Sequence, residues 1–152
     1  MKKVFALVLT LTILCCTVFC FPAGASEVTK VTIEKLDNGD YIETIITYYE
    51  TDDRAATKSG SKTNSYKNSN DETLWSVTVY GTFTYNGTTS SCTSVSHSAS
   101  AYADGWSIKN SSSSKSGYCA TATATATQKK LLSSKDYSMT VNLYCSPYGI
   151  LS

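Results

Sequence analysis

The chain has 152 residues, of which 13 are basic and 12 acidic, so its formal net charge at neutral pH is +1. This balance excludes proteins that bind nucleic acid or an anionic membrane through bulk charge. The length suits one ordinary domain with a hydrophobic core. The abundance of Ser, Thr and Tyr in alternating runs is typical of solvent-facing β-strands.

The first 25 residues have the features of an export signal. Two lysines precede an apolar run that ends at Phe21, and Ala23-Gly24-Ala25 offers the small residues that a signal peptidase needs. A retained membrane anchor would need about twenty apolar residues without such a cleavage site. We therefore predict a signal peptide over 1–25, a secreted, extracellular protein, and no transmembrane anchor in the mature chain.

The segment 26–49 is predicted to form a β-hairpin. Val, Ile, Thr and Tyr flank Asn38-Gly39, a dipeptide that favours two-residue hairpin turns. A two-residue turn sets Glu34 opposite Glu43, and facing glutamates are unfavourable. Residues 50–62 contain almost no large apolar side chain, so we expect a polar linker there, followed by a second unit over 63–152.

Alternation with a period of two predicts the strands of this second unit. From Trp75 to Tyr85 the odd-numbered residues are mostly apolar and the even-numbered ones polar, a pattern that a helix cannot satisfy. Asn86-Gly87 then predicts a turn. The other expected elements are a return strand over 88–95, a short strand over 106–108, a serine-rich loop over 110–117 and a strand over 137–145.

The run CATATATAT, residues 119–127, places every alanine on one strand face and every threonine on the other, together with Cys119. Buried alanines let a second layer approach closely, and threonines suit a wet β-surface. Several amphipathic strands and no helical period predict an all-β fold. The expected architecture is an antiparallel β-sandwich, either immunoglobulin-like or a small barrel, with one disulfide.

Three cysteines lie beyond the predicted cleavage site, and strand parity assigns their faces. Cys145 falls on the apolar face of its strand. With a two-residue turn at Asn86-Gly87, Cys92 opposes Gly81 on the apolar side, whereas a three-residue turn would move it to the other face. We predict a disulfide between Cys92 and Cys145, worth about 4 kcal/mol, and a Cys119 thiol that is free or bonded to another molecule.

The sequence contains no familiar catalytic or metal-binding constellation. The cysteines lack the short paired spacing of structural zinc sites, and the single histidine, His97, is close in sequence only to Cys92. The adjacent carboxylates of Asp71-Glu72 point to opposite sides of an extended chain. No phosphate loop or nucleophile motif occurs. We predict no enzyme activity, no metal and no cofactor.

Aromatic residues on polar strand faces are the candidate ligand-binding residues. Tyr80 and Tyr144 each stand alone among Ser, Thr and Asn side chains of their strands. Such rings stack on sugars or anchor a protein partner, although tyrosine is also simply a good strand former. A cell-surface glycan or protein is therefore the expected partner of Tyr80 and Tyr144, and nucleic acid is not expected.

The run YKNSNDETLWSVTVYGTFTYNG, followed by the Cys92 strand and the ending LYCSPYGILS, resembles small secreted proteins of Gram-positive, clostridia-like bacteria. The resemblance spans about 62–152 and implies export and a β fold, without pointing to a site. The leading hypothesis is a secreted, non-enzymatic β-domain that binds a ligand at or beyond the cell surface. The alternatives are a secreted antagonistic peptide or toxin that acts on membranes, and a matrix or structural component joined through Cys119 or strand edges.

Overall fold

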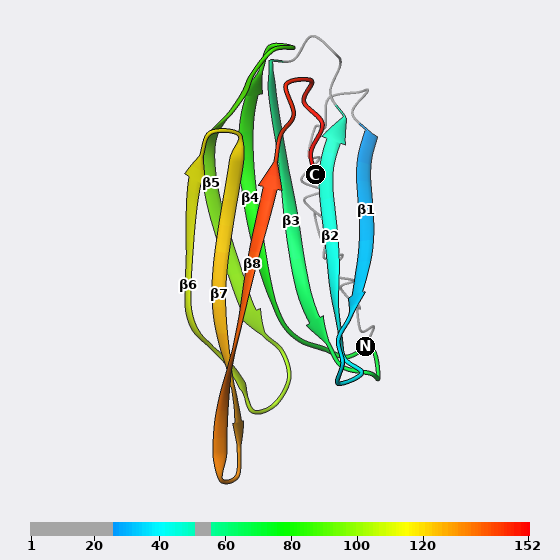
Figure 1. The fold of residues 1–152 in the computed structure, drawn as a ribbon, viewed down its shortest axis with the longest axis vertical. Helices are drawn as coiled ribbons and strands as arrows, with labels where there is room; N and C mark the ends of the chain where they lie inside the picture. The colour runs from blue at the N-terminus through cyan, green and yellow to red at the C-terminus, as the bar shows by residue number, and fades with distance from the viewer. Residues whose placement is uncertain (1–25, 51–55) are drawn as a thin grey trace, which may run out of the picture.

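Eight β-strands form two antiparallel sheets in the computed structural model, which describes residues 26–50 and 56–152 (Figure 1). No helix occurs within these ranges. The predicted all-β, antiparallel fold is therefore confirmed. One sheet has the order β1-β2-β3-β4-β5 and the other β6-β7-β8. The strands are β1 (Ser26–Lys35), β2 (Tyr41–Glu50), β3 (Thr57–Lys67), β4 (Thr73–Tyr85), β5 (Ser90–Ala101), β6 (Trp106–Ser116), β7 (Cys119–Lys130) and β8 (Ser133–Tyr144).

Two segments that were expected to be irregular form strands instead. Residues 57–62 of the expected linker are the first half of β3, which pairs with β2 and β4. Residues 110–116 of the expected serine-rich loop continue β6 alongside β7. Backbone pairing supplies these strands with hydrogen bonds, so they need no large apolar side chains of their own. The signal peptide predicted over 1–25 and linker residues 51–55 lie outside the described residues.

The first hairpin closes through a three-residue loop and not through the two-residue turn that we expected. The Gly39 amide donates to the carbonyl of Leu36 (3.1 Å), and the Leu36 amide donates to the carbonyl of Asp40 (2.9 Å). Gly39 has a φ of 86°, which suits the left-handed position of such loops. The resulting register sets Glu34 opposite Ile42. The longer loop therefore removes the unfavourable pair of facing glutamates.

The β4–β5 turn is displaced from its predicted position. The Asn86 amide donates to the Thr89 carbonyl (3.2 Å), so the two central residues of the turn are Gly87 and Thr88 instead of Asn86 and Gly87. Tyr85 therefore pairs with Ser90, and the same register places Cys92 opposite Phe83 instead of Gly81. Because the pairing has moved by two residues, Cys92 still lies on the buried side.

The core lies between the two sheets. The three-stranded sheet covers β3, β4 and β5 and leaves β1 and β2 beside it (Figure 1). Small residues bring the layers close together, since a Cβ atom added to Gly81 would lie 3.1 Å from that of Ala120. The fully buried core side chains include Trp75, Val77, Val79 and Phe83 of β4, the alanines of β7, and Val141 and Leu143 of β8. The threonines of β7 point to the opposite, outward side of the strand.

Candidate binding face on the three-stranded sheet

A row of threonines runs along the outward side of β7, and each is joined to β8. Thr121 donates to Asn142 Oδ1 (2.8 Å), and Thr127 donates to Asp136 Oδ1 (2.6 Å). The hydroxyls of Thr123 and Thr125 bond to those of Thr140 (3.2 Å) and Ser138 (2.9 Å). We call these eight residues the threonine face. Its hydroxyls repeat about every 6.8 Å along the strand, and the cross-strand bonds hold each rotamer in place.

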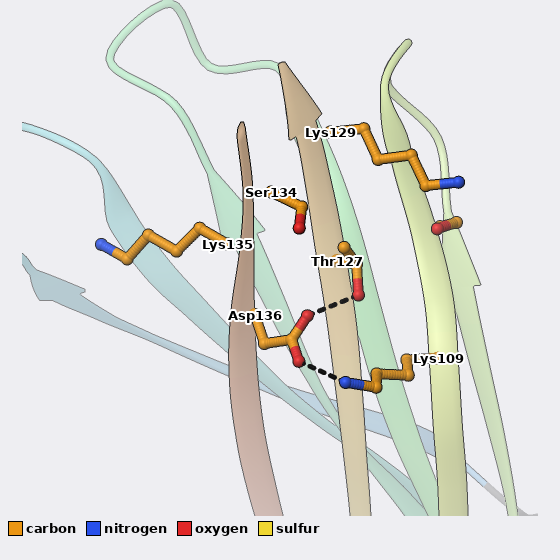
Figure 2. A pocket seen from close by; sticks show the side chains of 7 residues that line it. Lys109, Thr127, Lys129, Ser134, Lys135 and Asp136 are labelled. Carbon is orange, nitrogen blue, oxygen red and sulfur yellow. Dashed lines mark hydrogen bonds and ion pairs between the residues drawn. The ribbon is translucent and has the colours of Figure 1, made fainter. Parts of the chain in front are cut away.

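The lower end of the threonine face is a shallow, charged hollow of about 650 Å³. Figure 2 shows Asp136 between Thr127 and Lys109, while Lys135 and Lys129 point away from it. Lys109 Nζ lies 2.6 Å from Asp136 Oδ2. The hydrogen bonds from Lys109 and Thr127 hold the pKa of the Asp136 carboxyl below its usual range. Asp136 therefore stays ionised and serves as a hydrogen-bond acceptor and not as a general acid.

The upper end of the threonine face carries two aromatic rings. Tyr144 lies directly opposite Cys119 in the β7–β8 register. The ring of Tyr118, in the β6–β7 turn, has its centroid 6.0 Å from that of Tyr144. Tyr118 is 57% exposed and Tyr144 38% exposed. This pair offers solvent-facing ring surface at the end of the row of hydroxyls.

A cavity of about 350 Å³ adjoins Tyr118. Its walls come from the β4–β5 loop, the β6–β7 turn and the segment after β8. Backbone hydrogen bonds join these walls, from Gly87 to the Pro147 carbonyl (2.8 Å) and from Cys145 to the Tyr118 carbonyl (3.0 Å). Because these backbone bonds connect its walls, the cavity is formed in the absence of a ligand. The lining residues are Thr88, Thr89, Ser90, Tyr118, Cys145, Ser146 and Pro147.

The two tyrosines expected from the sequence lie on opposite outer surfaces of the molecule. Tyr144 lies at the upper end of the threonine face. Tyr80 is 46% exposed on the outward side of β4, paired with Ser61 and Ser96, and its hydroxyl lies 3.5 Å from Ser98 Oγ. The structure therefore separates Tyr80 and Tyr144, and they cannot contact one compact ligand together.

The three cysteines gather at the upper end of the fold as free thiols. Cys92 (6% exposed) and Cys145 (1%) lie on the core side, and burial raises the pKa of both thiols. The predicted bond between them is not present in this structure, in which the Cys92 Sγ donates to the Ser94 carbonyl (3.3 Å) and the Cys145 Sγ to the Ser146 carbonyl (3.4 Å). Cys119 is half-buried on the threonine side.

Both ring nitrogens of His97 are engaged in hydrogen bonds between strands. Its two ring nitrogens bond to Ser113 Oγ (3.0 Å) and Ser111 Oγ (3.2 Å), which joins β5 to β6. No cluster of three or more potential metal ligands occurs in residues 26–50 and 56–152. Within the same ranges, no helix is long and apolar enough to cross a membrane.

Sequence reasoning missed Tyr118 and the Lys109–Asp136 pair. The alternation of the alanine–threonine run places Tyr118 on the alanine side, but Tyr118 lies in the turn before β7 and is exposed. Lys109 and Asp136 meet only because β6 and β8 flank β7, and that order is a tertiary property. The alternation of β7 marked the threonines themselves, although it did not reveal their hydrogen-bonded partners.

Comparison with known proteins returned no match to the chain among protein-family models, curated proteins or solved structures.

Proposed function

We propose that this protein is a secreted, non-enzymatic binding domain that takes an extended glycan at or beyond the cell surface. The observation that carries the proposal is the threonine face, a row of fixed hydroxyls that ends at the exposed rings of Tyr118 and Tyr144. The ligand lies along β7, with one sugar ring stacked on this aromatic pair.

The chemistry of the face fits a polyhydroxylated chain. Hydroxyl and amide groups both donate and accept hydrogen bonds, as sugar hydroxyls do. Tyrosine presents an apolar ring to the C–H face of a sugar and keeps a polar tip. Because cross-strand bonds already hold the threonine rotamers, binding costs little side-chain entropy.

For the exported protein, the proposal includes an antiparallel β-sandwich, immunoglobulin-like or a small barrel, closed by a Cys92–Cys145 disulfide. The amides of these two cysteines bond to the neighbouring carbonyls of Gly117 (2.7 Å) and Tyr118 (3.0 Å). Both thiols therefore flank one turn on the core side, and an oxidising environment favours their pairing. Peptide mapping without reductant is expected to recover a Cys92–Cys145 peptide; a linked Cys119 peptide would contradict the assignment.

A matched pair of tyrosine variants tests the binding face. Tyr144→Ala is expected to weaken co-sedimentation with insoluble bacterial cell-wall glycan, and retention on immobilised oligosaccharides, by about fivefold or more, since a stacked ring is worth roughly 1 kcal/mol or more. Tyr80→Ala is the control, because it removes a slightly more exposed tyrosine from the opposite surface. Loss of binding with Tyr80→Ala alone, or no binding by the wild type, would overturn the proposal.

Two assays separate this function from its alternatives. Release of dye from vesicles, without retention on glycan, would favour an antagonistic toxin. Reductant-sensitive or concentration-dependent polymers without either activity would favour a matrix role. Secretion itself is checked by mass spectrometry of the exported protein, which is expected to begin at Ser26.

A further inference from the structure

The β7–β8 hairpin ends in two leucines that lie almost entirely in solvent. Leu131 is 99% exposed and Leu132 is 95% exposed. They form a two-residue loop, since Lys130 pairs with Ser133. The hairpin projects beyond the other strands at this end of the molecule (Figure 1). The most exposed apolar side chains among the described residues therefore stand at the outermost point of a protrusion.

The fold itself does not require leucine at these two positions. Short hairpin loops favour Gly, Asn and Asp, whose backbones adopt positive φ angles readily. Neither leucine has a positive φ, and neither packs against the hydrophobic core. Exposed apolar groups of this kind point to a partner that covers them.

Lysines surround the tip on both strands. Lys129 and Lys130 end β7, and Lys135 lies on β8. Figure 2 shows Lys129 and Lys135 pointing away from Asp136, whose carboxylate is already paired with Lys109. Within residues 26–50 and 56–152, none of the three lysines of the tip makes an ion pair, and the Lys135 ammonium lies 4.8 Å from the centroid of the Tyr137 ring, which leaves its charge unneutralised. The tip is therefore an apolar point with a collar of unneutralised positive charge.

The base of the hairpin is firmly attached to the body of the protein. The Lys129 amide donates to the Gly105 carbonyl (2.7 Å). The ring of Tyr137 packs between Tyr66 (5.6 Å between centroids) and Trp106 (5.0 Å), which joins the hairpin to both sheets. A rigid base presents the leucines without a further ordering cost.

We propose that the β7–β8 hairpin tip docks this protein on an anionic lipid bilayer. Leu131 and Leu132 enter the boundary between headgroups and acyl chains, while Lys129, Lys130 and Lys135 contact lipid phosphates. Lysines placed beside an apolar point suit this interface, because their charged ends remain among the headgroups. The lysine collar supplies the second signal that two leucines alone would lack. Docking is peripheral and reversible, and it goes beyond glycan binding.

Vesicle co-sedimentation with the full mature chain tests this proposal. Wild-type protein is expected to bind vesicles that contain phosphatidylglycerol and to bind pure phosphatidylcholine weakly. Leu131→Ser with Leu132→Ser is expected to lower the partition coefficient by about tenfold or more. Replacement of the three lysines by Gln is expected to cause a similar loss, and salt is expected to reproduce that loss in the wild type.

Val31→Ser with Ile33→Ser is the matched control for the leucine variant. Val31 (54% exposed) and Ile33 (61%) are also solvent-exposed apolar residues, but they lie on β1 of the other sheet. This control is expected to bind vesicles like the wild type. Equal binding by wild type and both tip variants would overturn the proposal, as would equal binding to neutral and anionic vesicles.

Two further readouts separate bilayer docking from glycan binding and from self-association. Tyr144→Ala is expected to leave vesicle binding intact, and the leucine variant to keep its retention on glycan, so each proposal can fail alone. Self-association that the leucine variant abolishes, without vesicle binding, would assign the tip to a second copy of the chain and overturn the bilayer assignment.

Discussion

At the scale of single residues, the environment of each group decides its chemistry. Asp136 is an exposed carboxylate, yet the amine of Lys109 and the hydroxyl of Thr127 each lie 2.6 Å from one of its oxygens. Both donors favour the ionised form and lower the pKa of the carboxyl. The pair thus fixes the charge pattern at the lower end of the threonine face.

Lys109→Gln is expected to raise the pKa of Asp136 toward its usual value, because the ammonium is the first cause of the shift. Since the folded-state pKa lies below the unfolded one, the Lys109–Asp136 pair stabilises the fold at neutral pH, and this contribution disappears as the pH falls through the folded pKa. Carboxyl NMR titration measures the shift. Lys135→Gln is the control, and an unchanged Asp136 titration in Lys109→Gln would contradict this account.

The three cysteines differ in how accessible their thiols are to solvent. Burial raises the pKa of Cys92 and Cys145 and shields both sulfurs, whereas Cys119 is half-buried beside Thr121. In fully reduced, native protein, iodoacetamide at mildly alkaline pH is expected to label Cys119 well before the other two. Peptide mass spectrometry over a time course follows the labelling. Equal rates at the three sites would show that the parity argument fails.

At the scale of elements, β7 explains the alternation of alanine and threonine. Each alanine is completely buried between the sheets, and each threonine bonds to β8 on the outside. The missing side chain at Gly81 brings β4 within contact of Ala120. Larger residues on the alanine side would force the layers apart, whereas the threonine side has room.

Ala122→Leu is expected to lower the free energy of unfolding by about 1–3 kcal/mol, because the added atoms overpack a closed core. Thr123→Val, one residue away on the outer side, is expected to change the free energy of unfolding by about 0.5 kcal/mol or less. Urea denaturation of both variants provides the comparison. A stability loss that is larger for Thr123→Val would show that the two sides of β7 are assigned in reverse.

The sequence predicted some elements well and others not, for a definite physical reason. Strands β4, β7 and β8 alternate because one side of each is buried in the core. Strands β3 and β6 carry runs of Ser, Thr, Asn and Lys, and their segments 57–62 and 110–116 were expected to be linker and loop. Their pairing with neighbours is a tertiary effect that local composition does not record.

The exact position and length of each turn limited how well the register could be predicted. Asn38-Gly39 and Asn86-Gly87 marked both hairpins correctly, but the first loop has three residues and the second turn is centred one residue later, on Gly87 and Thr88. A register shift of one residue moves every side chain to the other face, whereas a shift of two residues preserves the faces. The predicted side of Cys92 therefore remained correct, and the expected Glu34–Glu43 pairing did not.

At the scale of the whole molecule, the segment after β8 fastens the sheets together. Leu151 is completely buried, forms an isolated bridge with Cys145, and lies against Gly60 of β3.

Leu151→Ala is expected to lower the free energy of unfolding by about 2–5 kcal/mol. Chemical denaturation checks this value, with the exposed Ile150→Ala as control. A loss for Leu151→Ala no larger than that control would contradict the packing described here.

The molecule as a whole separates its surfaces by chemistry. The threonine face lies along β7 and β8, with Tyr144 of β8 and Tyr118 of the β6–β7 turn at its upper end. The leucine tip lies at the far end of the same hairpin, and Tyr80 lies on the opposite sheet. One hairpin thus carries both proposed contacts, with glycan along its outer side and lipid at its tip. The five-stranded sheet supports this hairpin by covering its alanine side.

Backbone amide NMR during titration with soluble fragments of cell-wall glycan tests the central claim most directly. Chemical-shift changes are expected along the outward residues of β7 between Thr121 and Thr127, along those of β8 between Asp136 and Tyr144, and at Tyr118. Residues around Tyr80 are expected to remain unchanged. Shift changes centred on β4 and β5, or no changes at saturating fragment, would contradict the assignment of the threonine face as the binding surface.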